Sequence, residues 1–243
     1  MTKLYKKSEI TFAILWIIAY VILSSIADQL SESVGIKKSL TAALHAAMSL
    51  ILFLWIRKNG LSVKYGLCKS GVPAKRFLYY LPLAVIASTA LWSGIGLPYG
   101  PAGTVCYVIS MCCVGFLEEV IFRGLLFRAM EKGGLKTAAV ISALTFGFGH
   151  IVNLFNESGR SFASSVFQIA FAVLVGFVLV LIFIHSGSLI PCILFHSANN
   201  VLHAFEAESS PETGWFMALN AVLVFAVLGG YLLYLVRTFG KKV

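Results

Sequence analysis

Two adjacent glutamates, followed four residues later by an arginine, interrupt an otherwise apolar stretch of this chain. Glu118 and Glu119 precede Val-Ile-Phe and then Arg123. A charged side chain at membrane depth costs about 2.5 to 3.5 kcal/mol on insertion scales, so such groups are kept mainly where they have a role. A carboxylate in this setting can act as a general base. This stretch is therefore the first candidate for a chemical site.

Helical spacing separates the roles of the two glutamates. Glu119 and Arg123 are four residues apart and share a helix face, so we expect them to pair. Glu118 points about 100° away around a turn of about 3.6 residues, which leaves it as the free carboxylate. Taken alone, the three residues fit a buried ion-pair cluster without chemistry equally well.

Two later apolar stretches carry histidines in a similar setting. In Phe146-Gly-Phe-Gly-His150 the phenylalanine and the histidine share a face, and the glycines allow a neighbouring backbone to come close. His196 and Asn200 are also four residues apart on one face. Each pattern by itself is as typical of hydrogen bonds between membrane helices as of catalysis.

The depths of these polar groups make them a candidate site together. Counted from the inner helix ends, Glu118, His150, His196 and Asn200 lie about 12 to 20 Å deep at about 1.5 Å per residue. A carboxylate, two imidazoles and an amide at similar depth predict a water-activating site with donors for an oxyanion. We expect a polar active-site cavity between the fourth, fifth and seventh helices.

The composition predicts an all-α, polytopic membrane protein. The chain is 59% hydrophobic and 12% charged, with a mean hydropathy of +0.90, whereas soluble domains carry roughly 25% charged residues. A membrane helix needs about 20 apolar residues. We expect one membrane-embedded domain over residues 1–243 with about eight transmembrane helices, near 10–27, 40–56, 77–97, 104–129, 137–155, 162–185, 188–205 and 215–237.

The charge distribution predicts the orientation of these helices. With eight spans and a cytoplasmic N-terminus, 16 of the 19 Lys and Arg residues fall in cytoplasmic segments. Both termini are then cytoplasmic. Membrane orientation explains the net charge of +9, so no nucleic-acid partner is needed to account for it.

Other polar positions have structural explanations. His45 and Gln168 are isolated within apolar stretches, and we expect each to form a hydrogen bond with a neighbouring helix. The sixth and seventh spans are separated only by Ser186-Gly187-Ser188, which predicts a tight hairpin.

The three polar motifs, in this order on separate spans, resemble a known family. Glu118 to Arg123 fits E-E-x-x-x-R, Phe146 to His150 fits F-x-x-x-H, and His196 to Asn200 fits H-x-x-x-N. The set is similar to the CAAX protease and bacteriocin-processing family (CPBP, or Abi) of intramembrane endopeptidases, which includes CAAX prenyl endopeptidases. The resemblance covers a core of about 104–205.

The resemblance implies a role for each motif residue. Glu118 would be the general base, with His150 as its partner in holding the attacking water. His196 and Asn200 would donate to the tetrahedral oxyanion, while Glu119 and Arg123 would support the helix geometry and the charge state of Glu118. The substrate would be a peptide, or a prenylated or otherwise hydrophobic protein, in the lipid bilayer.

Several alternatives remain open at this point. Asp28 is the single aspartate, which excludes an aspartyl intramembrane protease, and H-E-x-x-H is absent. We favour a cofactor-free site, although zinc at the Glu118, His150 and His196 positions is not excluded by residue type. A non-catalytic membrane adaptor or bacteriocin-immunity protein on the same scaffold is the main alternative. A transporter would predict internal symmetry, and none is visible.

The expected location is a cell membrane, and a bacterial plasma membrane is favoured by the short chain, its brief loops and the lack of an organelle-retention signal. The substrate itself and its cleavage site are not readable from the residues.

Overall fold

The computed structural model describes residues 1–92, 94–152, 162–207 and 214–240. Within these ranges the chain is built of helices joined by turns. The helical elements are α1 Thr2–Lys7, α2 Glu9–Val34, α3 Ser39–Lys58, η1 Ala74–Tyr80, α4 Leu81–Ser88, η2 Thr89–Leu91, α5 Gly100–Glu118, η3 Glu119–Phe127, α6 Arg128–Met130, η4 Glu131–Gly133, α7 Leu135–Gly149, η5 His150–Val152, α9 Phe162–Ser186, α10 Ile190–Leu202, η6 His203–Phe205 and α11 Gly214–Phe239.

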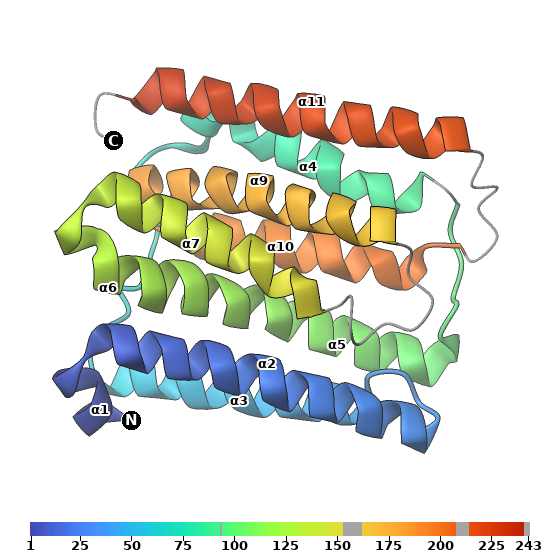
Figure 1. The fold of residues 1–243 in the computed structure, drawn as a ribbon, viewed down its shortest axis with the longest axis horizontal. Helices are drawn as coiled ribbons and strands as arrows, with labels where there is room; N and C mark the ends of the chain where they lie inside the picture. Colours follow the sequence, from blue (N-terminus) through green and yellow to red (C-terminus); the bar gives the residue numbers. More distant parts are fainter. Residues whose placement is uncertain (93, 153–161, 208–213, 241–243) are drawn as a thin grey trace.

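The long helices lie side by side and run back and forth along one axis (Figure 1). The α2–α3 hairpin forms one side of the bundle, and α4 with α11 forms the opposite side. Between them, α5 packs against α3 and α10, while α7 packs against α9 and η3. The segment α5–η3 therefore lies in the middle of the bundle, where its polar residues can be shielded from lipid.

Six helices among the described residues are long and apolar enough to cross a membrane, and together with the apolar composition they indicate a multi-pass membrane protein. They are Glu9–Val34, Ser39–Lys58, Gly100–Gly133, Leu135–Val152, Phe162–Ser186 and Ala218–Phe239. The other two expected spans, 77–97 and 188–205, contain the shorter helices α4 and α10. The count of eight crossings stays a prediction for those two elements.

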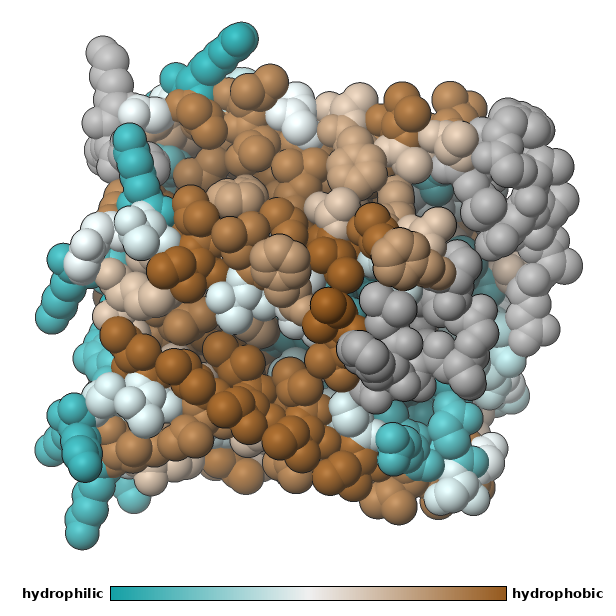
Figure 2. Space-filling view, in the orientation of Figure 1, coloured by the Kyte–Doolittle hydropathy of each residue, from teal (hydrophilic) through white to brown (hydrophobic). Residues whose placement is uncertain are grey.

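The outer surface has the character that a bilayer requires. Large apolar side chains point outward along the helices, including Ile22 at 52%, Leu50 at 57% and Leu233 at 57% exposure. Figure 2 shows apolar side chains over the middle of one face, with hydrophilic side chains gathered toward its ends. In lipid this outward apolar surface is solvated, so the fold does not need to bury it.

Local sequence sets several helix boundaries. Pro82, Pro101 and Pro191 each lie in the first turn of a helix, where the missing backbone N–H has no partner to lose. Ser8 caps α2 by accepting a hydrogen bond from the Thr11 N–H at 3.1 Å. These residues explain why the helices begin where they do.

The predicted tight hairpin between the sixth and seventh spans is confirmed. Helix α9 ends at Ser186 and α10 begins at Ile190. Gly187 between them has a φ of 67°, a left-handed conformation that glycine adopts without strain. The hairpin places α10 antiparallel to α9 and beside α5.

The N-terminus and the C-terminal end of α11 lie at the same end of the bundle (Figure 1). This matches the prediction that both termini share one side of the membrane, and the assignment of that side to the cytoplasm stays a prediction. Some of the charged residues used for it lie outside the described ranges: Glu157, Arg160, Glu208, Glu212, Lys241 and Lys242.

A polar cluster fixes the chain at this end of the bundle. Lys64, in the loop after α3, donates to the Glu9 carboxylate at 2.6 and 2.7 Å and to the Tyr5 hydroxyl at 2.9 Å. Partial burial lowers the pKa of Lys64, but the bonds to Glu9 and Tyr5 raise it by more, so the net pKa lies above the ordinary 10.5. The cluster connects this loop to α1 and α2.

Candidate active site

The two glutamates lie where one kind of helix changes into another. Glu118 is the last residue of α5, and Glu119 begins η3, a nine-residue π-helix that ends at Phe127. All residues of η3 are buried. Stretches of π-helix are rare, and they occur frequently at functional sites. A π-helix has a wider turn than an α-helix, so the side-chain directions change from Glu119 onward. The spacing of an α-helix therefore does not by itself determine where these side chains point.

The predicted pair between Glu119 and Arg123 is confirmed. Arg123 Nη1 donates to Glu119 Oε1 at 3.1 Å, and both side chains are fully buried. The guanidinium also lies 4.1 Å from the centre of the Phe146 ring, which is close enough for a cation–π interaction. Arg123 thus connects η3 to α7.

His196 lies between the two carboxylates. Its Nδ1 is 2.8 Å from Glu119 Oε1, and its Nε2 is 3.4 Å from Glu118 Oε2. Because a carboxylate only accepts, Nδ1 carries the proton toward Glu119. The contact between Nε2 and Glu118 is favourable when one further proton lies between them, on either atom.

Glu118 is the more accessible of the two carboxylates. Its side chain is 13% exposed, whereas that of Glu119 is 0% exposed. Its Oε1 accepts a hydrogen bond of 2.7 Å from the Tyr20 hydroxyl. Glu119 is thus held by Arg123 and His196, while Glu118, which the helical spacing left as the free carboxylate, contacts Tyr20 and His196 and is the more exposed of the two.

His150 begins η5, directly after α7, and is half-buried. Its Nδ1 lies 3.1 Å from the carbonyl oxygen of Phe146, so Nδ1 carries a proton, and in the neutral imidazole Nε2 holds the lone pair. The Phe146 ring meets the His150 ring edge-on at 5.2 Å and the His196 ring at 5.6 Å. One phenylalanine thus separates and orients both imidazoles.

Asn200 lies one turn after His196 in α10 and is half-buried. Its Oδ1 is 3.4 Å from Asn199 Nδ2. Among the hydrogen bonds of the described residues, none joins Glu118 to His150 or to Asn200. The structure therefore brings Glu118, Glu119, Arg123 and His196 into direct contact, with His150 linked to them through the ring of Phe146.

A close approach of two helices makes the contact between His196 and the glutamates possible. Gly115 lies one turn before Glu119, and a Cβ at this position would lie 2.6 Å from the Ser197 nitrogen and 2.9 Å from its Cα. Such distances leave no room for any side chain. The glycine lets α10 pack directly on α5, which puts His196 within reach of both carboxylates.

Tyr20 was not predicted as a site residue. It lies in α2, far from the motifs in sequence, and a tyrosine in an apolar helix carries no motif of its own.

His45 behaves as predicted for an isolated polar group, since its ring nitrogens lie 2.9 Å from the hydroxyls of Ser24 in α2 and Ser110 in α5.

Comparison with known protein families identifies the segment that holds the motifs. The family model for type II CAAX prenyl endopeptidase Rce1-like proteins matches residues 100–202. Residues 100–202 are therefore similar to the CAAX endopeptidase family. The family match includes Glu118, Glu119, Arg123, His150, His196 and Asn200, and it excludes α2 and α3. No curated protein and no solved structure matches the chain.

The matched family is one of prenyl endopeptidases, and the matched segment contains three of the helices that are long and apolar enough to cross a membrane. The match does not by itself assign roles to residues. Among the residues that the structure describes, no group of three or more His, Cys, Asp or Glu side chains is arranged to hold a metal ion.

An apolar groove runs along the outside of the helix bundle. It has a volume of about 510 Å³ and lies between α2, η3 and α7. Its lining residues are Ile17, Val21, Phe122, Ile141, Leu144, Thr145, Phe148 and Gly149. The lining includes Val21 and Gly149, the sequence neighbours of Tyr20 and His150, and none of the predicted site residues. The polar cavity expected between the fourth, fifth and seventh helices stays a prediction.

Proposed function

We propose that this protein is an intramembrane endopeptidase that hydrolyses a peptide bond in a membrane-associated peptide or protein. The observation that carries the proposal is His196 between two carboxylates of unequal exposure, inside an apolar bundle. If the cluster were only a structural ion pair, one carboxylate, that of Glu119, would be enough to pair with Arg123. The second carboxylate, Glu118, is the more exposed and faces a histidine, which is the arrangement that a general base requires.

In the proposed reaction, water lies between Glu118 and His150 Nε2. Glu118 takes a proton from the water while the water oxygen forms a bond to the scissile carbonyl carbon. The carbonyl π electrons move to its oxygen and give a tetrahedral oxyanion. When the oxyanion collapses, the C–N bond breaks, and the leaving nitrogen receives the proton from Glu118. His150 has the lone pair on Nε2 needed to orient the water, because its Nδ1–H is bonded to Phe146.

His196 and Asn200 are the proposed donors to the oxyanion. The bond from Nδ1 to Glu119 holds the His196 ring in place, so a proton on Nε2 points into the site. Asn200 lies one turn further along the same face and offers an amide N–H. In other hydrolases, removal of one such donor costs about 2.7 to 4 kcal/mol of transition-state stabilisation.

The substrate we propose is a peptide or a prenylated or otherwise hydrophobic protein that reaches the site from the lipid. The apolar groove between α2 and α7 supports this, because it gives an apolar chain a place to lie along the outside of the bundle. The proposed location is a bacterial plasma membrane, with the site opening toward the cytoplasmic half.

The test is cleavage by the purified protein in lipid nanodiscs, with C-terminal peptides, prenylated and unprenylated, as substrates. In H₂¹⁸O the new C-terminal carboxyl should gain one ¹⁸O, and His150→Gln should abolish cleavage without lowering Tm. We propose water activation by protein groups alone, so incubation with a strong chelator should leave the rate unchanged. An adaptor or immunity protein would give no cleavage, and its biological activity would survive His150→Gln.

A further inference from the structure

Tyr20 brings a hydroxyl group to Glu118 from outside the matched family segment. It lies in α2, before residues 100–202, and its side chain is only 8% exposed. The hydroxyl donates to Glu118 Oε1 at 2.7 Å. None of the roles proposed above uses this contact, although it is the shortest hydrogen bond that Glu118 makes.

The bond from Tyr20 determines how the Glu118 carboxylate is turned. The last torsion of a glutamate is broad, so a carboxylate without a fixed partner samples many orientations. A hydrogen bond to an ionised acceptor is stronger than one between neutral groups. With Oε1 held by Tyr20, Oε2 faces His196 Nε2 at 3.4 Å. The hydroxyl therefore keeps the two oxygens in distinct environments.

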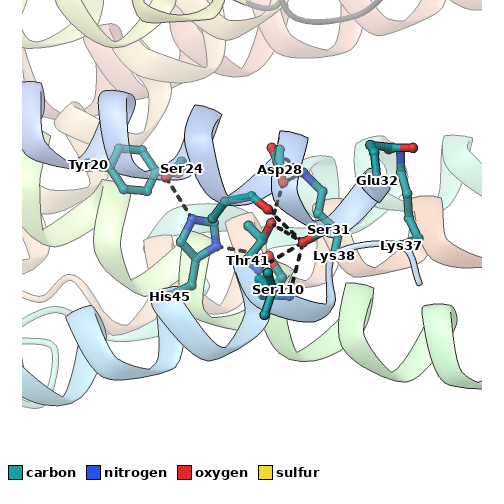
Figure 3. A network of polar contacts seen from close by, with 12 residues as sticks. Tyr20, Ser24, Asp28, Ser31, Glu32, Lys37, Lys38, Thr41, His45 and Ser110 are labelled. Carbon is teal, nitrogen blue, oxygen red and sulfur yellow. Dashed lines mark hydrogen bonds and ion pairs between the residues drawn. The ribbon is translucent and has the colours of Figure 1, made fainter. Parts of the chain in front are cut away.

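His45 in turn holds Tyr20 in place. Its ring lies 5.6 Å from the Tyr20 ring, and the two planes are tilted by 33°. His45 is 2% exposed, and its nitrogens lie 2.9 Å from Ser24 on α2 and from Ser110 on α5. One buried imidazole thus joins three helices beside the tyrosine, as Figure 3 shows for Tyr20, Ser24, His45 and Ser110.

Further polar contacts fix the register of α2 against α3 beyond His45. Asp28 on α2 accepts from Lys38 Nζ at 2.9 Å and from the Thr41 hydroxyl at 2.6 Å. Ser31 Oγ lies 3.2 Å from Thr41 Oγ1. Figure 3 shows these residues following one another along the interface of the two helices. These contacts keep α2 from shifting along α3, and His45 of α3 is bonded to Ser110 of α5. The position of Tyr20 along the bundle axis is therefore fixed relative to α5.

We propose that Tyr20 is a positioning residue for Glu118, and that the polar interface of α2 and α3 is the support that keeps it at the site. This inference rests on the proposed function, because the orientation of Glu118 affects a rate only if Glu118 acts as the base. It extends the active unit beyond residues 100–202 to the N-terminal hairpin.

The main test is Tyr20→Phe, which removes the hydroxyl and keeps the ring. In the cleavage assay kcat should fall by about 10- to 100-fold, the range for losing a hydrogen bond to a charged group. KM should stay within about twofold, because the hydroxyl is already bonded to Glu118. A kcat equal to that of the wild type would overturn the proposal.

Tyr231→Phe is the matched control. Tyr231 is 3% exposed, and its hydroxyl donates to the Phe77 carbonyl at 2.9 Å, at the α4–α11 side of the bundle. It therefore also loses a buried hydroxyl bond, here to a neutral carbonyl oxygen. Both variants should lose Tm, Tyr231→Phe by no more than Tyr20→Phe, and only Tyr20→Phe should lose kcat. Equal losses of kcat in the two variants would mean that Tyr20 acts through stability alone, which contradicts positioning.

A second readout does not depend on cleavage. The infrared carboxyl bands of Tyr20→Phe should differ from those of the wild type, and the difference should vanish when both proteins also carry Glu118→Gln. His45→Phe, which keeps Tyr20 and Glu118, should change the same band and lower kcat less. If the wild type cleaves nothing but the band difference is present, the proposed function fails and the contact stands. If the wild type cleaves and no difference appears, the positioning proposal fails alone.

Discussion

His196 Nδ1 donates to Glu119 Oε1 over 2.8 Å, although the two residues are 77 positions apart in the chain. The contact joins α10 to the start of η3 in the interior of the bundle. Glu119 also accepts from Arg123 through the same oxygen. The fully buried glutamate therefore sets both the orientation of a histidine and the position of an arginine, and its loss should affect both.

Glu119→Gln should lower both stability and activity. Arg123 would remain buried without a charged partner, and breaking a buried pair in this way costs about 3 to 5 kcal/mol. His196 would lose the carboxylate that orients its ring. We expect a clear fall in Tm in nanodiscs and a kcat near background in the cleavage assay.

A double variant separates these two effects. Replacement of both partners, by Glu119→Leu with Arg123→Met, removes the unpaired charge, so Tm should recover in part relative to Glu119→Gln. The rate should not recover, because His196 still lacks its acceptor. Recovery of cleavage in the double variant would contradict the role given to Glu119.

Gly115→Ala should separate α10 from α5. The added Cβ would lie 2.6 Å from the Ser197 nitrogen, so one helix must move. A displacement of reacting groups by about 1 Å can cost about 100-fold in rate, and we expect a loss of that order. Gly229→Ala in α11 is the control, since nothing lies within 4 Å of a Cβ there. Wild-type kcat in Gly115→Ala would show that the close approach is not needed.

Phe146→Leu should weaken the contact between η3 and α7. The ring lies under Arg123 at 4.1 Å, and a desolvated cation–π pair contributes about 2 kcal/mol or more. The same ring orients His150 and His196, so kcat should fall together with Tm. Phe53→Leu is the control, because Arg57 lies 5.9 Å from that ring and the ring is 40% exposed. A larger Tm loss for Phe53→Leu would contradict this assignment.

The Lys64 cluster predicts a loss of stability at high pH. Because the pKa of Lys64 is raised in the folded protein, its contribution is complete below the ordinary 10.5 and is lost as pH rises through the higher folded value. Wild-type Tm should therefore fall above pH 10.5 more steeply than that of Glu9→Gln, which lacks the carboxylate partner. Parallel Tm curves for the two proteins would show that the cluster adds no pH-dependent stability.

The position of residues 131–136 tests the orientation. In a variant without native cysteines, Lys132→Cys should react with a membrane-impermeant maleimide only from the cytoplasmic side, since the surrounding segment is positively charged. Labelling from the external side alone would reverse the predicted topology.

Local spacing in the sequence predicts the pairing of Glu119 with Arg123, since four residues along a helix bring two side chains together. It also predicts the turn at Gly187, because the residues that form the turn, Ser186, Gly187 and Ser188, are adjacent in the chain. His45 was correctly expected to bond to neighbouring helices, but its partners Ser24 and Ser110 were not identifiable. Residue type is visible in the sequence, whereas the partner depends on packing.

The contacts that cross the bundle could not be predicted. The bond from His196 to Glu119 depends on how closely α10 approaches α5, and that distance is set by Gly115, one glycine among 21. The π-helix at Glu119 changes side-chain directions without a sequence pattern that reveals it. Tyr20 reaches Glu118 only because α2 packs on η3. These are tertiary relationships, which periodicity along one helix does not contain.

The most direct measurement is the kcat of Glu118→Gln relative to the wild type, with both proteins in identical nanodiscs. The Tm of each protein is measured alongside, to show that the variant is folded. The amide keeps the shape of the side chain and can still accept from Tyr20, but it cannot take a proton from water. We predict a loss of at least about 100-fold, as expected for removal of a general base. A rate within about threefold of the wild type would contradict the central claim that Glu118 is the base of a peptide-hydrolysing site.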